Sequence, residues 1–159
     1  MLPQRQIFPG ARQMEVRFPD GTIVRGSPLS DRDANQGWRQ FGLYLDPGWR
    51  PQWPASTVEW PDFGVPTDPD QASEAIVQAF ELARSGQKVE VGCIGGIGRT
   101  GTVLACMAVL AGVVPERAVQ WVRDNYHPHA VEIDGQREFV EEFARRFSAW
   151  STEEPSAPS

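Results

Sequence analysis

A cysteine and an arginine enclose the segment of this sequence that has the clearest capacity for chemistry. Five residues separate Cys93 from Arg99, and three of the five are glycines. Glycines let the backbone turn its N–H groups inward, which creates a concave site for an anion. A thiolate is a strong nucleophile, and a guanidinium can hold two phosphoryl oxygens through its planar pair of N–H groups. The segment therefore predicts a nucleophile that faces a phosphate-binding loop, formed by Ile94, Gly95, Gly96, Ile97, Gly98 and Arg99.

Two elements would position this loop. Lys88–Val91 is predicted as a short strand, and Thr100–Ala111 is apolar almost all round, which is typical of a helix buried on every side. The N-terminus of such a helix carries partial positive charge, so it favours both a thiolate and a bound anion. Cys106 lies about 10 Å further along that helix at about 1.5 Å per residue, so we expect it to pack in the core rather than to act as a redox partner of Cys93.

The remaining elements follow from turn and capping signals. Asp20-Gly21 between Met14–Phe18 and Thr22–Val24 predicts a hairpin, and Gly42–Leu45 and Thr57–Trp60 are two further strand candidates. Three more helices are predicted: one begins at Asp68-Pro69 and ends at Gly86, one runs from Pro115 to about Asn125, and one is capped by Asp134 and has an apolar face of Phe139, Val140, Phe143, Phe147 and Trp150. This order predicts an α/β fold, a central, mostly parallel sheet of about four to five strands flanked by helices around one buried helix.

Length and composition indicate one globular domain and exclude several kinds of partner. The 159 residues are 40% hydrophobic and 23% charged, which is the balance of a soluble globular protein. The net charge is −6 and Lys88 is the single lysine, so duplex nucleic acid is not an expected partner. The chain has two cysteines, no leader and no apolar run of about 18 residues. We therefore expect neither a disulfide scaffold nor a membrane span, and we expect the protein to be cytoplasmic. We expect a folded domain over residues 13–150, between a flexible N-terminus at 1–12 and a disordered tail at 151–159.

The loop resembles the signature of the cysteine-dependent protein tyrosine and dual-specificity phosphatases. The run Cys93-Ile-Gly-Gly-Ile-Gly-Arg99-Thr100-Gly-Thr is much more specific than a bare cysteine and arginine. Trp60–Pro66, with Asp62 placed 31 residues before Cys93, resembles the mobile loop that carries the family's general acid. Ala130–Gln136 resembles the loop whose glutamine positions the hydrolytic water. The resemblance covers roughly residues 22–147 and implies a phosphatase-like fold.

The resemblance also implies a role for each matching residue. Cys93 would attack phosphorus to form a phosphocysteine, and Arg99 with the loop N–H groups would stabilise the transition state. Asp62 would protonate the leaving oxygen and later act as the base, while Thr100 would stabilise the departing thiolate and Gln136 would hold the water. Neither a metal nor another cofactor is implied.

Two positions depart from the family pattern. The family usually has histidine before the cysteine, where this chain has Gly92, so one hydrogen-bonded orienter of the loop is missing. The tyrosine-specific members have a first glutamine where this chain has Glu132, so only Gln136 can be given a glutamine role.

The expected substrate is a phosphorylated protein or a small phosphomonoester. The loop interior contains no Lys or Arg, which favours a single phosphate on an apolar or aryl group over an inositol polyphosphate. We therefore favour a protein tyrosine or dual-specificity phosphatase. A phosphatase of small molecules or RNA 5′ ends is the alternative within the same chemistry, and a phospho-motif binding module with little turnover is the alternative outside it.

Aromatic and basic residues outside these loops have weaker assignments. Trp38, Phe41, Trp49 and Trp53 could line the substrate mouth, but packing in the core or at an edge is favoured. We expect solvated side chains, or less often substrate contacts, for Arg25, Arg32, Arg123 and Arg137.

Overall fold

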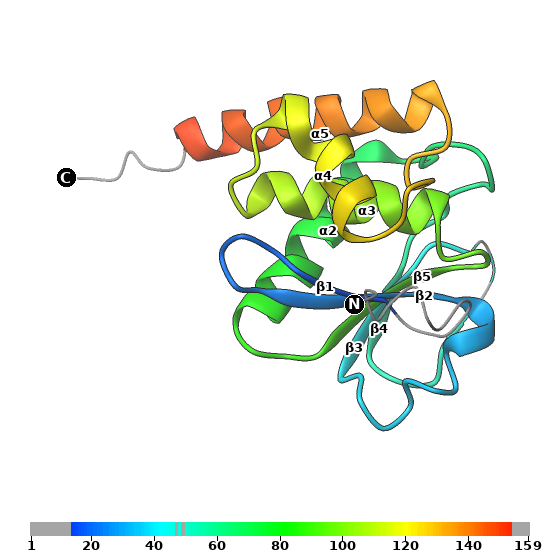
Figure 1. Cartoon of the computed structure of the whole chain (residues 1–159). Coiled ribbons are helices and arrows are strands. Elements are labelled where there is room, and N and C mark those ends of the chain that lie inside the picture. The colour runs from blue at the N-terminus through cyan, green and yellow to red at the C-terminus, as the bar shows by residue number, and fades with distance from the viewer. Residues whose placement is uncertain (1–13, 47, 49, 154–159) are drawn as a thin grey trace, which may run out of the picture.

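A five-stranded sheet forms the base of the molecule (Figure 1). The computed structural model describes residues 14–46, 48 and 50–153. The strands are β1 (Met14–Arg17), β2 (Ile23–Pro28), β3 (Phe41–Tyr44), β4 (Ala55–Thr57) and β5 (Val89–Cys93), in the order β1-β2-β5-β3-β4. β1 and β2 form the predicted antiparallel hairpin, and the other neighbouring pairs are parallel. The predicted α/β fold with a mostly parallel sheet is confirmed.

The parallel pairing gathers three chain segments at one edge of the sheet. β5 lies between β2 and β3, with Gly92 level with Ser27 on one side and Tyr44 on the other. The residues that follow these three strands therefore emerge side by side at the carboxyl edge, where ligands bind in open α/β sheets. The backbone continues this association, because Leu29 N–H donates to Ile94 O over 3.1 Å and Leu45 N–H donates to Gly92 O over 3.0 Å.

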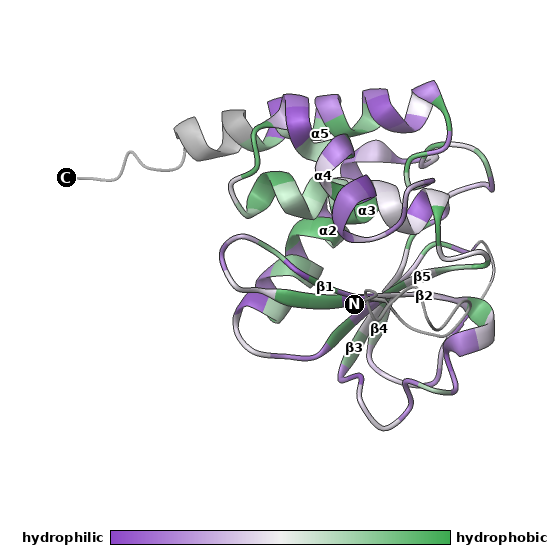
Figure 2. Ribbon diagram, viewed as in Figure 1, coloured by the Kyte–Doolittle hydropathy of each residue, from purple (hydrophilic) through white to green (hydrophobic). Residues whose placement is uncertain are grey.

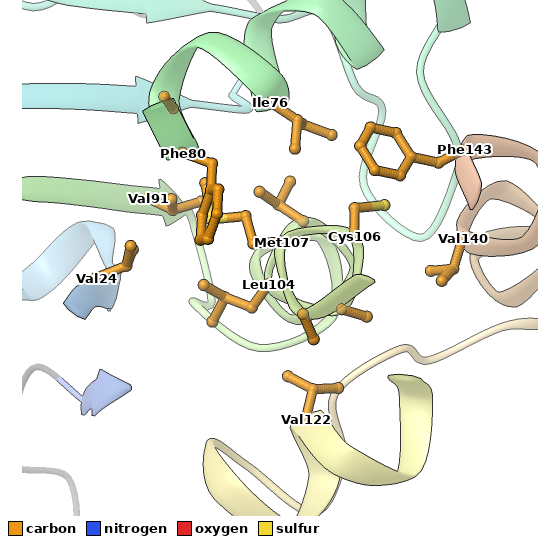
Figure 3. Close-up of a cluster of buried hydrophobic side chains, with 14 of the residues drawn as sticks. Val24, Ile76, Phe80, Val91, Leu104, Cys106, Met107, Val122, Val140 and Phe143 are labelled. Atoms are coloured by element: carbon orange, nitrogen blue, oxygen red, sulfur yellow. The ribbon is translucent and has the colours of Figure 1, made fainter. Parts of the chain in front are cut away.

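Within the described part of the chain, four α-helices lie on one side of the sheet (Figure 1). They are α2 (Pro69–Arg84), α3 (Gly98–Leu110), α4 (Pro115–Asn125) and α5 (Asp134–Glu153). α2 and α3 pack on the strands, while α4 and α5 pack against α3. In Figure 3, α3 is seen end-on and is surrounded by side chains from α2, α4, α5 and the sheet. Its residues from Gly98 to Val109 are all buried, as expected for a helix that is apolar all round.

The outer helices follow the expected division between apolar and polar faces. Figure 2 shows hydrophilic turns along α4 and α5, whereas α3 and the strands beneath it carry mainly hydrophobic residues. The inward face of α5 includes the buried side chains of Phe139, Val140 and Phe143. Among the described residues, no helix is both long and apolar enough to cross a bilayer.

Several local predictions are corrected by the structure. The strand expected at Thr57–Trp60 is Ala55–Thr57, because the chain leaves the sheet at Val58 and buries Val58 and Trp60 in the core instead. The buried helix begins at Gly98, two residues earlier than expected. α5 continues to Glu153, beyond the expected boundary at residue 150. Trp49, residues 1–13 and 154–159, and the side chain of Trp150 lie outside the described residues.

The segment between β2 and β3 is attached to the sheet through a buried carboxylate. Glu90 of β5 is fully buried, and it accepts hydrogen bonds from Asn35 Nδ2 at 2.6 Å and from Arg39 Nε at 2.6 Å. It also accepts hydrogen bonds from Ser27 Oγ at 2.6 Å and from the hydroxyl of Tyr44. A buried charge is tolerated only when it is paired and hydrogen-bonded. Glu90 therefore holds the segment that contains Asn35 and Arg39 against β5.

Candidate active site

The Cys93 thiol lies at the carboxyl end of β5, with hydrogen-bond donors around its sulfur. Gly96 N–H donates to Sγ over 3.2 Å, and the Thr100 hydroxyl donates to Sγ over 3.1 Å. Gly96 has a φ of +68°, a left-handed conformation that turns its N–H group inward and that glycine adopts without steric cost. The structure thus brings Cys93, Gly96 and Thr100 together at the start of α3.

Arg99 lies in the first turn of α3 and joins the phosphate-binding loop to two other segments. Its side chain is 2% exposed, and Nη1 donates to Trp60 O over 2.7 Å and to Leu45 O over 3.2 Å. Its Nη2 lies 3.3 Å from Asp62 Oδ1 and 3.9 Å from Asp46 Oδ1. Backbone carbonyls thus hold Nη1, and carboxylates lie beside Nη2, so the orientation of the guanidinium is fixed.

Asp62 belongs to a tight turn that lies beside Arg99. Gly64 N–H donates to Pro61 O over 2.9 Å, and Trp60 Nε1 donates to Gly64 O over 2.7 Å. Phe63, within the turn, has a φ of +55°, a conformation that costs a non-glycine residue about 1–3 kcal/mol and is concentrated at functional sites. The Asp62 side chain is 60% exposed, so a substrate could reach it.

Gln136, in the first turn of α5, is engaged at both ends of its amide. Its Oε1 accepts from Glu132 N–H over 2.7 Å, and its Nε2 donates to Gly64 O over 3.1 Å. The side chain is fully buried and connects the loop before α5 to the loop that carries Asp62. An amide has two donor hydrogens and two acceptor lone pairs, so these bonds use half of its capacity. Because the side chain is fully buried, the surrounding loops would have to move before it could contact a water.

Three functional candidates were missed in the sequence. Tyr126, just after α4, donates its hydroxyl to Gly96 O beneath the phosphate-binding loop. Burial raises the pKa of the Tyr126 phenol, and the charges of Cys93 and Asp31 raise it further, so the hydroxyl stays a donor. Asp46 contacts Arg99. Its position just after a predicted parallel strand could have indicated that it lies at the same sheet edge as Cys93. Arg32, expected to be solvated, is buried against Asp46, which no local pattern indicated.

The other assigned residues lie away from the thiol or pack structurally. Cys106 is fully buried in α3, where burial raises the pKa of its thiol. Arg25 contacts Asn35 and the ring of Trp38, and Arg39 covers the ring of Trp53, so these two tryptophans have packing partners. Phe41 is partly buried against the core. Arg123 donates to Ala130 O and Val131 O, and Arg137 is exposed.

Among the described residues, no group of three or more His, Cys, Asp or Glu side chains is placed to hold a metal ion. The site brings together the Cys93 thiol, the Gly96 N–H group, the buried Arg99 guanidinium and the exposed Asp62 carboxylate.

The fold and this combination of groups define a phosphatase of the protein tyrosine and dual-specificity class. More specifically, the chain belongs to the family described as the DSP-PTPase phosphatase domain of Swiss Army Knife proteins, which matches residues 63–155. That match includes Cys93, Arg99 and Gln136 and begins one residue after Asp62.

The chain also has relatives in sequence. An uncharacterized protein of Methanocaldococcus jannaschii is 39% identical over 116 residues, which cover 65% of this chain and 76% of that protein. Protein tyrosine phosphatase domain-containing protein 1 of Danio rerio is 31% identical over 103 residues, 62% of this chain and 14% of that protein.

Solved structures share the fold. The crystal structure of Tk-PTP in its active form is 25% identical with a TM-score of 0.64, covering 82% of this chain and 97% of that one. Kinase-associated phosphatase, solved with its catalytic cysteine replaced by serine, has a TM-score of 0.70 at 16% identity, covering 87% of this chain and 96% of that one. At this identity, the second likeness concerns the fold alone.

Proposed function

We propose that this phosphatase hydrolyses phosphomonoesters through a phosphocysteine at Cys93, and that its substrates are phosphotyrosine or mixed phosphotyrosine and phosphoserine/threonine proteins. The observation that carries the mechanism is the sulfur of Cys93, which accepts from Gly96 N–H and the Thr100 hydroxyl next to the fixed guanidinium of Arg99. A thiolate in this position can attack phosphorus while the loop N–H groups and Arg99 bind the equatorial oxygens.

The first step forms the S–P bond of the phosphocysteine and breaks the P–O bond to the leaving group. Asp62, exposed and 3.3 Å from Arg99 Nη2, donates a proton to the departing oxygen. In the second step, Asp62 takes a proton from water, water oxygen attacks phosphorus, and the thiolate leaves with Thr100 stabilising its charge. Gln136 would orient that water through its amide once movement of the Asp62 loop gives the water access to the buried side chain.

The surroundings of the loop support the preference for an apolar or aryl group. Ile94 of the loop is 55% exposed and Phe63 beside Asp62 is 63% exposed, while Leu29, which is bonded to Ile94 through the backbone, is 41% exposed. Such large apolar side chains suit the ring of a phosphotyrosine, and they provide no cation for a second phosphate.

The mechanism is tested by hydrolysis of p-nitrophenyl phosphate in the presence of a chelator. Wild type should be active, Cys93→Ser should be inactive while still binding phosphate, and Cys106→Ala is the matched control because Cys106 lies in the core. Intact mass spectrometry after rapid acid quench should find one added phosphoryl group on wild type. Turnover by Cys93→Ser, or complete loss of wild-type activity in chelator, would refute the mechanism.

Substrate class is tested separately with a panel at equal concentration. Phosphotyrosine and phosphoserine peptides should be hydrolysed faster than inositol polyphosphates, nucleotides, sugar phosphates and RNA with a 5′ triphosphate. Faster turnover of any member of the second group would replace the protein substrate with that class. Binding of phosphopeptides without turnover would favour the binding module.

A further inference from the structure

Arg32 reaches across β5 immediately before the nucleophile. It follows the short 3₁₀ helix η1 (Leu29–Asp31), which continues from the end of β2 on one side of β5. Asp46 follows β3 on the other side of β5, yet Arg32 Nη2 lies 2.6 Å from Asp46 Oδ2. The two side chains are 3% and 7% exposed, so this buried ion pair bridges the two neighbours of the nucleophile strand.

The bridge passes close to Gly92 and leaves little room for a side chain there. A Cβ atom at position 92 would lie 3.0 Å from Arg32 Nη2 and 3.1 Å from Arg32 Nε, closer than ordinary van der Waals contact. A methyl group would require the guanidinium, and the Ser27 backbone oxygen at 3.2 Å, to give by a few tenths of an ångström. We expect the larger imidazole of a histidine to compete with the guanidinium for this space. The guanidinium also lies 4.7 Å from the centre of the Tyr44 ring, which is paired with Gly92 in the sheet.

The bridge continues to the phosphate-binding arginine. Asp46 Oδ1 lies 3.9 Å from Arg99 Nη2, and Arg99 Nη2 lies 3.3 Å from Asp62 Oδ1. Charges therefore alternate from Arg32 through Asp46 and Arg99 to Asp62. Without Arg32, the buried Asp46 carboxylate would be left with Arg99 as its nearest cation in this series, and it would draw the guanidinium away from the phosphate.

We infer that Arg32 is a positioning residue of this active site: its guanidinium fills the space above Gly92 and, through Asp46, holds Arg99 in the orientation that binds phosphate. The inference rests on the proposed function, because it assigns Arg99 to the phosphate. It also explains why residue 92 is a glycine here, since a support from a neighbouring segment occupies the volume that a side chain at 92 would require.

The test is a double-mutant cycle between positions 32 and 92, with Arg32→Lys as the conservative variant and Arg145→Ala as an exposed control. Arg32→Ala should lower kcat about 10- to 100-fold, the scale of a misplacement of about 1 Å in a catalytic group, while KM changes much less. Arg32→Lys should recover part of that loss because it keeps the charge beside Asp46. Gly92→His alone should be impaired because the imidazole displaces the guanidinium.

The combined variant separates positioning from general damage. Gly92→His/Arg32→Ala should be more active than the product of the two single losses predicts, because the imidazole then enters vacated space. The melting temperature should show the same coupling, with Gly92→His costing less in the Arg32→Ala background. Additive losses in both kcat and melting temperature, or wild-type kcat in Arg32→Ala, would overturn the inference.

These outcomes also separate the inference from the proposed function. If wild type shows Cys93-dependent turnover but the cycle is additive, the inference fails and the function stands. If wild type shows no Cys93-dependent turnover, the function fails, and vanadate affinity with the melting temperatures still decides the inference. Unchanged vanadate affinity in Arg32→Ala together with additive melting temperatures would then refute it.

Discussion

Tyr126→Phe removes one oxygen atom from beneath the phosphate-binding loop. The Tyr126 hydroxyl donates to Gly96 O, and Gly96 N–H in turn donates to Cys93 Sγ over 3.2 Å. The tyrosine thus fixes the peptide groups around Gly96, whose φ of +68° sets the direction of its N–H. Loss of the hydroxyl frees this part of the loop to turn its N–H groups away from the sulfur and the phosphate.

The expected size of the effect follows from burial. Tyr126 is 4% exposed, so water cannot easily replace its hydroxyl. A buried acceptor that loses its partner costs about 1–3 kcal/mol. If this cost falls on the phosphate-binding arrangement of the loop, kcat/KM decreases by about 5- to 150-fold, because each 1.36 kcal/mol corresponds to about tenfold.

Steady-state hydrolysis of p-nitrophenyl phosphate and inhibition by vanadate measure this loss. Tyr44→Phe is the matched control, since it removes the other tyrosine hydroxyl, which donates to Glu90 rather than to the loop. It should lower stability but change kcat/KM by less than about threefold. Gly26→Ala should reproduce the kinetic defect, because a Cβ there would lie 2.5 Å from the Tyr126 hydroxyl oxygen. Equal kinetic effects of Tyr126→Phe and Tyr44→Phe, or no effect of Tyr126→Phe, would refute this reasoning.

Three further predictions concern the charged residues. Arg99→Lys should lower kcat/KM by about 10²-fold or more, because one ammonium cannot serve Leu45 O, Trp60 O and two phosphoryl oxygens together; a loss below about fivefold would contradict this. Asp62→Asn should slow phenyl phosphate by about 10²- to 10⁴-fold but an activated aryl phosphate much less, and should flatten the falling limb of the pH–rate profile at high pH. Equal slowing of both substrates would assign Asp62 to loop structure. Arg39→Met should cost about 3–5 kcal/mol in urea unfolding, because the fully buried Glu90 loses its cation, with exposed Arg145→Met as the control; a cost below about 1 kcal/mol would contradict it.

Local signals account for much of the fold. The hairpin at Asp20-Gly21 formed as predicted because turn geometry depends on a few adjacent residues. α2 begins as predicted, with Asp68 accepting from Gln71 N–H and Pro69 at the first helical position. The strand at Thr57–Trp60 was misplaced because Val58 and Trp60 carry an apolar pattern that serves the core rather than a strand.

Within the candidate active site, the sequence alone was enough to identify most of the residues that we propose act on phosphate. Cys93, the glycines, Arg99 and Thr100 are adjacent in the chain, so a strand, a tight loop and a helix suffice to bring them together. Only the tertiary structure decided what supports them. The supporting residues Tyr126, Asp46 and Arg32 come from three other segments. Tyr126 contacts the loop at Gly96, Asp46 contacts Arg99, and Arg32 contacts Asp46. These contacts form because the segments after β2, β3 and α4 meet the loop in the folded chain. Arg32 illustrates the physical reason best: a charged side chain is expected in solvent unless a buried partner compensates for its desolvation, and Asp46, the partner that does so here, lies on the far side of β5.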